Sequence, residues 1–217
     1  MILKTSGTTG TPKIIEQPKE KLKFANEVAR QSQEIEKDSK IYTVCKITHA
    51  GGMLAQTRPA QEIGAEVTIE DFNAYRFVRK INDYTHTHIT PGHARLIMQT
   101  KSFKDLDLTG IWVTCGSDPV DWDIIEAFVQ RGATFMANWG MTEVGPCAIN
   151  HVFRTLNDVN QMKSDETILG SRMYCDYKIV NSELVIRGNI SVYGYAWFPT
   201  GDLVKEKNGT LYYLGRK

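Results

Sequence analysis

The feature that most constrains the fold is a regular alternation of short apolar runs with longer stretches of helical periodicity, between residues 41 and 139. The apolar runs have the length of buried strands, and the stretches between them place apolar residues at helical spacing. Strands that alternate with helices in this way form a parallel sheet with helices packed on it, so the pattern predicts an α/β fold. The predicted strands are 41–47, 66–69, 86–90, 111–115 and 134–139.

Turn residues predict where several of the intervening helices begin and end. A helix over 53–63 would end at Gly64, which can take the left-handed conformation, although Pro59 interrupts the hydrogen bonding of that helix. Asp121 is placed to cap a helix that Gly132 then ends. One further helix is predicted to begin near Pro18, and two others are predicted over 74–81 and 91–100.

The pattern changes after about residue 157. Short β-prone runs separated by turn residues replace the alternation, and a Lys-Asn-Gly run at 207–209 is typical of a hairpin turn. We therefore expect two parts: an α/β core over 1–157, and a β-rich subdomain over 158–217 that forms a small antiparallel sheet or a distorted barrel. The short runs are 174–180, 183–187, 192–198, 203–207 and 210–214.

Composition narrows the classes of partner. The formal net charge of +1 gives no electrostatic argument for nucleic acid. No run approaches the roughly 18 apolar residues of a membrane span, and the first residues leave no room for a signal peptide. We therefore expect a cytoplasmic protein without a membrane partner. Free thiols suit that compartment better than a disulfide, which is the alternative for Cys45, Cys115, Cys147 and Cys175.

A loop rich in glycine and hydroxyl side chains, Thr-Ser-Gly-Thr-Thr-Gly-Thr-Pro-Lys, occupies residues 5–13. Gly7 and Gly10 let the backbone turn tightly, so that successive N–H groups can face an anion, and Lys13 adds a positive charge. The loop therefore suits a polyphosphate, although its spacing differs from the Gly-x4-Gly-Lys pattern of P-loop proteins. Taken alone, a flexible loop without a ligand explains it equally well.

A second polar segment, Asn-Trp-Gly-Met-Thr-Glu at 138–143, follows a predicted parallel strand, where open α/β sheets bind ligands. Thr142 can donate to a phosphate, Glu143 can hold Mg²⁺, and Trp139 can stack on a base. Asp202, within a Thr-Gly-Asp run, can accept hydrogen bonds from both hydroxyls of a ribose. Taken singly, these residues are better explained by a packed Trp, a surface Glu and a turn.

Two other groups of residues could suggest chemistry. His86, His88 and His93 are closely spaced, but no clear carboxylate or cysteine ligands accompany them, so surface or packed histidines are the better interpretation. Cys115, flanked by Thr114 and Gly116, is better explained as a core thiol than as a nucleophile.

In combination, these segments resemble the adenylate-forming (AMP-binding) superfamily of acyl-CoA synthetases, peptide-synthetase adenylation domains and luciferases. Loop 5–13 is similar to the family's Thr-Ser-Gly-Thr-Thr-Gly-x-Pro-Lys signature, and 138–143 to its aromatic-Gly-x-Thr-Glu motif, with Trp for the usual Tyr. Phe-Pro-Thr-Gly-Asp-Leu at 198–203 resembles its Thr-Gly-Asp motif, and 215–216 its Gly-Arg motif. Four motifs in the family's order along essentially the whole chain make the resemblance highly specific.

The resemblance implies catalytic roles for four residues. Lys13, with the loop hydroxyls, would attend the β- and γ-phosphates of ATP, and Thr142 would bind the α-phosphate. Glu143 would hold Mg²⁺. His49 resembles the family's histidine beside the acyl pocket.

The resemblance also implies a set of nucleotide-binding residues. Asp202, helped by Arg216, would hold the ribose, while Trp139 would stack on the purine that 116–118 line. The full set is Thr5, Ser6, Gly7, Thr8, Thr9, Gly10, Gly116, Ser117, Asp118, Asn138, Trp139, Gly140, Met141, Thr142, Asp202 and Arg216.

The family's reaction joins a carboxylic acid to the α-phosphorus of ATP and releases pyrophosphate, and many members then pass the acyl group to coenzyme A or another thiol. Family members also carry a long segment before the loop, and a small C-terminal domain whose Lys contacts the α-phosphate; the sequence matches neither. We therefore expect adenylation to be slow. We also expect a homodimer or a partner chain to cover the surface that the first of these segments covers in the family. A non-catalytic AMP/ATP-binding module and one subunit of a split ligase are the alternatives.

Overall fold

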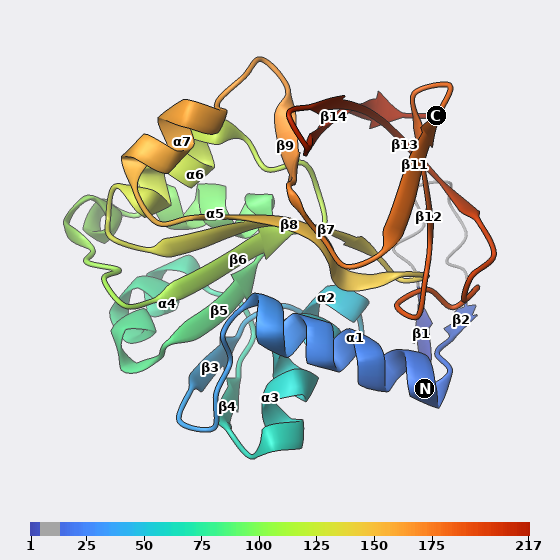
Figure 1. The fold of residues 1–217 in the computed structure, drawn as a ribbon. Helices are drawn as coiled ribbons and strands as arrows, with labels where there is room; N and C mark the ends of the chain where they lie inside the picture. The colour runs from blue at the N-terminus through green and yellow to red at the C-terminus, as the bar shows by residue number, and fades with distance from the viewer. Residues whose placement is uncertain (5–13) are drawn as a thin grey trace.

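The computed structural model describes residues 1–4 and 14–217 (Figure 1). A central seven-stranded sheet has helices on both faces, and a separate five-stranded sheet lies beyond its β8 end. This architecture confirms the predicted fold class, a parallel sheet with flanking helices followed by a small antiparallel β-rich part. The central sheet runs, in spatial order, β10 (Arg172–Met173), β8 (Gly145–Phe153), β7 (Thr134–Met141), β6 (Trp112–Gly116), β5 (His86–Ile89), β3 (Lys40–Thr43) and β4 (Glu66–Ile69).

Strands β4, β3, β5, β6 and β7 run parallel, as the alternation predicts. Strands β8 and β10 extend the sheet with antiparallel pairing. The sequence pattern does not predict β8, because the chain leaves β7 through a tight turn closed by a hydrogen bond from Val144 N to Met141 O, 3.0 Å long, and not through a helix. Gly140 makes the hairpin possible, since a Cβ there would lie 2.1 Å from Gly145 O.

Alternate residues of the central strands face two helical layers. On β6, Val113 and Cys115 pack in the cluster that faces α4 to α7, whereas Trp112 packs in the cluster that contains α1 residues such as Val28 and Ala29. Both faces are therefore buried, as a parallel sheet requires. The helical segments are α1 (Lys19–Ser32), α2 (Ala50–Gly52), η1 (Met53–Thr57), α3 (Arg58–Ile63), α4 (Ala74–Lys80), η2 (Ile81–Asp83), α5 (Pro91–Met98), η3 (Lys101–Asp105), α6 (Trp122–Val129) and α7 (Leu156–Met162).

The helix expected over 53–63 is present, but its first part, η1, is a π-helical turn, and only the second part, α3, which contains Pro59, is α-helical. Pro59 has no N–H to donate to Ala55 O. The side-chain amide of Gln33 on the neighbouring segment donates to that carbonyl instead, at 2.6 Å. Gly64 ends the segment with φ 76°, as predicted.

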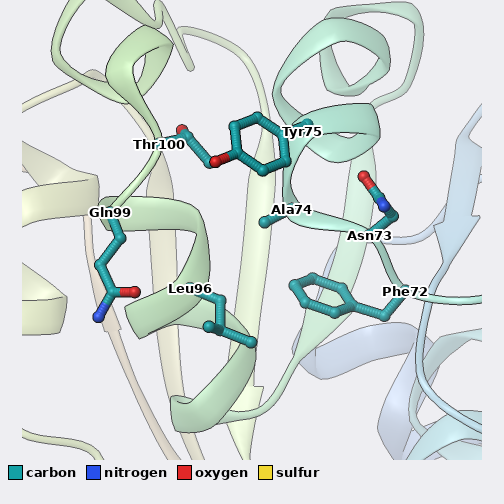
Figure 2. A pocket seen from close by; sticks show the side chains of 7 residues that line it. All are labelled: Phe72, Asn73, Ala74, Tyr75, Leu96, Gln99 and Thr100. Atoms are coloured by element: carbon teal, nitrogen blue, oxygen red, sulfur yellow. The ribbon is translucent and has the colours of Figure 1, made fainter.

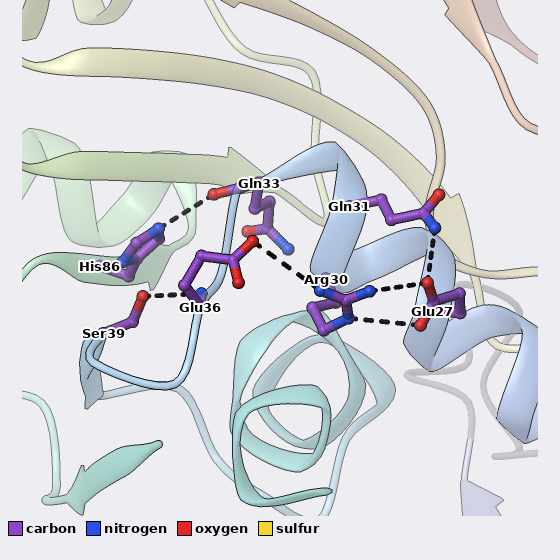
Figure 3. A network of polar contacts seen from close by, with 7 residues as sticks. All are labelled: Glu27, Arg30, Gln31, Gln33, Glu36, Ser39 and His86. Carbon is purple, nitrogen blue, oxygen red and sulfur yellow. Dashed lines mark hydrogen bonds and ion pairs between the residues drawn. The ribbon is translucent and has the colours of Figure 1, made fainter. Parts of the chain in front are cut away.

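Gln33 is the centre of a buried polar network under the sheet. Its Oε1 accepts hydrogen bonds from Gln56 Nε2 at 2.9 Å and Thr114 Oγ1 at 2.6 Å. Figure 3 shows the outer part of this region, where a ring nitrogen of His86 lies 2.9 Å from Gln33 O and Arg30 bonds to Glu27. The network joins the C-terminal end of α1 to η1 and to the central strands.

The cap expected at Asp121 differs in the structure. Asp121 is the N-cap residue of α6, but its carboxylate makes no capping bond with the described residues and pairs with Arg95 of α5. A cation within reach competes with the helix N–H groups for the same oxygens, which explains the difference. The predicted stop at Gly132 is observed, with φ 89°.

The five-stranded sheet is antiparallel throughout. Its predicted hairpin turn is confirmed, because Asn208 (φ 52°) and Gly209 (φ 74°) both take positive φ, as a type I′ turn requires. The strand expected at 192–198 is wrong over 192–197, where the chain forms turns and Gly194 has φ 57°. The strands are, in spatial order, β11 (Asp176–Val180), β12 (Glu183–Arg187), β13 (Phe198–Lys207), β14 (Thr210–Arg216) and β9 (Thr167–Gly170).

The remaining pair, β1 (Ile2–Lys4) with β2 (Ile14–Glu16), forms a small hairpin on either side of loop 5–13. Within the described ranges no helix is long and apolar enough to cross a bilayer. All four cysteines are free thiols, three of them buried.

Candidate nucleotide-binding site

Asp202 lies at a bend in β13 whose backbone is held by three hydrogen bonds. Gly201, with φ 80°, donates its N–H to Glu183 Oε1 at 2.9 Å. Thr200 Oγ1 accepts from Asp202 N at 3.1 Å and donates to Leu184 O at 2.8 Å. The position of the Asp202 carboxylate is therefore fixed by its own strand and by β12.

The Asp202 carboxylate lies between an indole and a guanidinium. Trp139 Nε1 donates to Asp202 Oδ2 at 2.9 Å, and Arg216 Nη1 lies 3.3 Å from Asp202 Oδ1. Asp202 is 5% exposed and Trp139 8%, whereas Arg216 is about half exposed. Burial raises the pKa of Asp202, and the hydrogen bond from Trp139 and the charge of Arg216 oppose that rise. Three expected site residues, separated by as many as 77 positions (216 − 139), thus meet at the Asp202 carboxylate through two contacts.

The segment expected to line the purine, 116–118, begins where β6 ends beside β7. Gly116 is required there, because a Cβ would lie 2.4 Å from Asn138 O. Ser117 takes φ 81°, which is rare for a residue with a side chain and re-aims the chain out of the sheet. The pKa of Tyr213 on β14 is raised mainly by burial and, to a smaller extent, by the negative charges of Asp202 and Asp118. Both carboxylates therefore lie near that strand.

Thr142 and Glu143 form the turn between β7 and β8. Glu143 is 9% exposed, and its carbonyl accepts from Val192 N at 2.8 Å. The side-chain amide of Asn138, near the end of β7, donates to Pro146 O across the same hairpin. The turn therefore lies directly beyond the strand that carries Trp139.

His49 lies before α2 and is exposed, with its Nδ1 3.4 Å from Thr48 Oγ1. The helix brings Gly51 close to the purine-side segment, since a Cβ at Gly51 would lie 3.3 Å from Ser117 Oγ and 3.0 Å from His88 Cε1. Burial lowers the pKa of His88 to about 4, so its imidazole is neutral. His93 stacks on Phe72 with ring centroids 3.9 Å apart.

The expected phosphate loop lies outside the described residues. This concerns Thr5, Ser6, Gly7, Thr8, Thr9, Gly10 and Lys13. The flanking strands are described, and they place both ends of the loop side by side, with Lys4 opposite Ile14.

The donor set fits a magnesium ion held mainly by its substrate. Over residues 1–4 and 14–217, no group of three or more His, Cys, Asp and Glu side chains could hold a metal ion. Mg²⁺ commonly binds one or two carboxylates together with substrate phosphates and water. The single carboxylate of Glu143 suits that mode and does not suit a cage made by the protein alone.

Glu183 is a residue that the sequence did not single out. Its two oxygens bond to Gly201 N and, at 2.6 Å, to Lys217 Nζ, so it ties the Asp202 bend to the end of β14. An acidic residue at the start of a strand gives no signal of such a role by itself.

A separate hollow of about 310 Å³ lies between α4 and α5 (Figure 2). None of the expected site residues lines it. Its wall combines apolar and neutral polar side chains, and it carries no charged group. The lining residues are Phe72, Asn73, Ala74, Tyr75, Leu96, Gln99 and Thr100.

Comparison with known proteins adds independent information on the fold and the family. The structure superposes with a TM-score of 0.81 on O-succinylbenzoate coenzyme A synthetase (MenE) from Bacillus subtilis in complex with AMP, at 19% identity, covering 100% of this chain and 49% of the other. It superposes with a TM-score of 0.82 on ATP-bound MatB from Rhodopseudomonas palustris, at 18% identity, covering 99% and 47%. These TM-scores show a shared fold.

In sequence, the chain is 25% identical over 248 aligned positions to indoleacetate–CoA ligase from Aromatoleum aromaticum strain EbN1, covering 100% of this chain and 47% of the ligase. The chain thus spans about half the length of these relatives. The model of the family described as AMP-binding enzyme matches residues 1–198, which is most of the chain. The chain therefore belongs to the AMP-binding enzyme family.

Proposed function

We propose that this chain binds ATP and takes part in activating a carboxylic acid as its acyl-adenylate. The observation that carries the proposal is the buried Asp202 carboxylate, held between Trp139 Nε1 and the Arg216 guanidinium. A desolvated carboxylate is a costly group to keep unless it serves a ligand or a fixed partner. It can accept hydrogen bonds from both hydroxyls of a ribose.

In the proposed reaction, an oxygen of the acid forms a bond to the α-phosphorus of ATP. The bond from that phosphorus to the bridging oxygen breaks, and pyrophosphate leaves with the electron pair. The chain's own residues position the reactants: Asp202 the ribose, Thr142 the α-phosphate, and Lys13 the outer phosphates. Such reactions depend mainly on orientation and on neutralising phosphoryl charge.

Magnesium would supply part of that neutralisation, with Glu143 as its protein ligand and phosphate oxygens completing the shell. His49 is proposed to lie beside the acid; it precedes α2, whose Gly51 lies close to Ser117. The relatives named as CoA ligases or synthetases support coenzyme A as the acceptor in a second step.

Assembly and location are proposed on separate observations. Ile2 and Ile14 project from the β1–β2 hairpin with 68% and 67% of their surfaces exposed, which suits coverage by a second copy or a partner chain. The four free thiols suit a reducing cytoplasm. The division at residue 157 also stays a proposal; β10, from the second part, pairs with β8 of the first.

Two measurements test the function. Calorimetry with AMP should detect binding by the wild-type chain and a loss of at least about tenfold in affinity for Asp202→Ala, since hydrogen bonds to a charged group contribute about 1.5–3 kcal/mol. Exchange of labelled pyrophosphate into ATP, with a panel of carboxylic acids, then tests chemistry. Exchange above background with one acid supports the ligase; AMP binding without exchange supports a binding module or one subunit of a split ligase. Equal AMP affinity in both proteins refutes the site.

A further inference from the structure

The N-terminal end of α1 makes a specific contact with the β7–β8 turn. Gln17, just before the helix, donates its side-chain N–H to Thr142 O at 2.9 Å. Its side-chain oxygen accepts from Lys21 Nζ at 2.6 Å, one helical turn further on. The two bonds form a chain from Lys21 through Gln17 to Thr142, and both side chains are buried, at 2% and 5% exposure.

Lys21 is an unusual residue to bury. Burial lowers its pKa to about 8, and the negative charge of Glu143 opposes that lowering, so Lys21 stays a cation at neutral pH. Lysine is almost never fully buried unless it is paired, because its desolvation is costly. The only hydrogen-bond acceptor of its ammonium group among the described residues is Gln17, and Glu143 is the carboxylate that acts on it.

The turn is held from its other side as well. Val192 N donates to Glu143 O at 2.8 Å, so the carbonyls of two successive residues, Thr142 and Glu143, are bound by groups from opposite directions in the sequence. The two peptide units that flank Glu143 are therefore each restrained by a hydrogen bond to their carbonyl, which limits their rotation. Thr142 and Glu143 carry the side chains proposed for phosphate and Mg²⁺.

We propose that Gln17 and Lys21 are positioning residues, which hold the Thr142–Glu143 turn in the orientation that receives the phosphates and Mg²⁺. This inference rests on the proposed function, because it assigns a purpose to residues behind the same site. Gln17 fixes the Thr142 carbonyl through a hydrogen bond, and Lys21 fixes Gln17 through a second one, which brings its buried ammonium group near the turn.

The test compares two ligands that differ in the triphosphate and Mg²⁺, which the Thr142–Glu143 turn would contact together with loop 5–13. MgATP needs Thr142 and Glu143, whereas adenosine needs only the ribose and purine side of the site. Gln17→Met removes both hydrogen bonds, and Lys21→Met removes the charge while keeping the bond from Gln17 to Thr142. Lys23→Met is the matched control, because it removes an exposed lysine from the same helix.

Affinities are measured by calorimetry after circular dichroism and thermal unfolding have shown which variants fold. We expect Gln17→Met to weaken MgATP about fivefold to tenfold, as the loss of about one hydrogen bond predicts, while adenosine affinity stays within about twofold. Lys21→Met should weaken MgATP in the same selective way, and carries the test if Gln17→Met does not fold. Lys23→Met should match wild type for both ligands.

Three results would overturn the inference, and they are distinguishable. If wild type binds both ligands and neither variant changes MgATP affinity, the positioning role is wrong while the proposed function stands. If the variants lose MgATP and adenosine equally, or both fail to fold, Gln17 and Lys21 are general structural residues. If wild type binds neither ligand, the proposed function itself fails, and the positioning role with it.

Discussion

Replacing Trp139 by Phe tests the contact that joins two distant parts of the site. Phe keeps an aromatic ring but lacks the N–H that Trp139 donates to Asp202 Oδ2 over 2.9 Å. Because Asp202 is buried, the vacated oxygen cannot be fully hydrated. A hydrogen bond to a charged group contributes about 1.5–3 kcal/mol, so we expect the free energy of unfolding at pH 8 to fall by about that amount.

The loss should depend on pH in a definite direction. The pKa of Asp202 is already raised by burial, and the indole N–H is one of the two groups that hold it down. Without that N–H, the pKa rises further, so the folded state holds the proton more tightly. The variant is therefore most destabilised above that pKa, where the carboxylate is charged, and the loss shrinks as the pH falls through it.

The same shift should appear in ligand binding. Adenosine is the suitable probe, since it lacks a phosphate that titrates near neutral pH. A charged Asp202 accepts from both ribose hydroxyls, so adenosine affinity falls as the pH is lowered through the pKa of Asp202. Glu183, Arg216 and Tyr213 also face this carboxylate and are unchanged in the variant. We therefore expect the fall in adenosine affinity to begin at a higher pH in Trp139→Phe than in wild type.

Trp112→Phe is the matched control. Trp112 lies on the neighbouring strand β6 and is 5% exposed, and its indole N–H has no hydrogen-bond partner among the residues that the structure describes. The substitution therefore removes the same atoms without removing a hydrogen bond. Urea unfolding at pH 8 and pH 5, with adenosine calorimetry across that range, measures both effects. Equal losses for the two variants, or a Trp139→Phe loss that does not change with pH, would refute the reasoning.

Further predictions concern the framework of the site. Gln33→Leu leaves the Ala55 carbonyl without its 2.6 Å hydrogen bond and should lower the free energy of unfolding by at least about 1–3 kcal/mol in urea titration; an unchanged midpoint would show that Gln33 does not replace the missing N–H of Pro59. Gly140→Ala would place a Cβ 2.1 Å from Gly145 O and should open the β7–β8 hairpin, weakening MgATP more than adenosine; wild-type affinities for both would contradict that geometry. Burial raises the pKa of the thiols of Cys45, Cys147 and Cys175 to about 12, so Ellman's reagent at pH 8 should react slowly with the native chain. After denaturation the reagent should count four thiols, and a count below four would indicate a disulfide.

Much of the fold follows from local signals in the sequence. The strand at Glu66–Ile69, the helix end at Gly64 and the turn at Asn208 and Gly209 each depend on residues within one segment, and each is observed. The failures depend on context. The run at 192–197 has β-prone aromatic residues, yet Gly194 takes a left-handed conformation that ends any strand there. Strand β8 was missed because its pairing with β7 is set by the hairpin turn.

The site could be predicted only as a set of separate motifs. The sequence indicates Trp139, Asp202 and Arg216 one by one, but no local pattern shows that an indole N–H would bond to a carboxylate 63 positions away. Gln17 and Lys21 gave no signal, since a Gln and a Lys one turn apart are typical of a solvated helix face. Their burial and their contact with Thr142 arise only when α1 packs against the β7–β8 hairpin.

The most direct test of the account is a crystal structure of the chain with bound AMP. We predict that both ribose hydroxyls lie within hydrogen-bond distance of the Asp202 carboxylate, and that the phosphate points toward Thr142. AMP bound elsewhere, for example in the hollow between α4 and α5 shown in Figure 2, with Asp202 still bonded only to Trp139 and Arg216, would contradict the central claim.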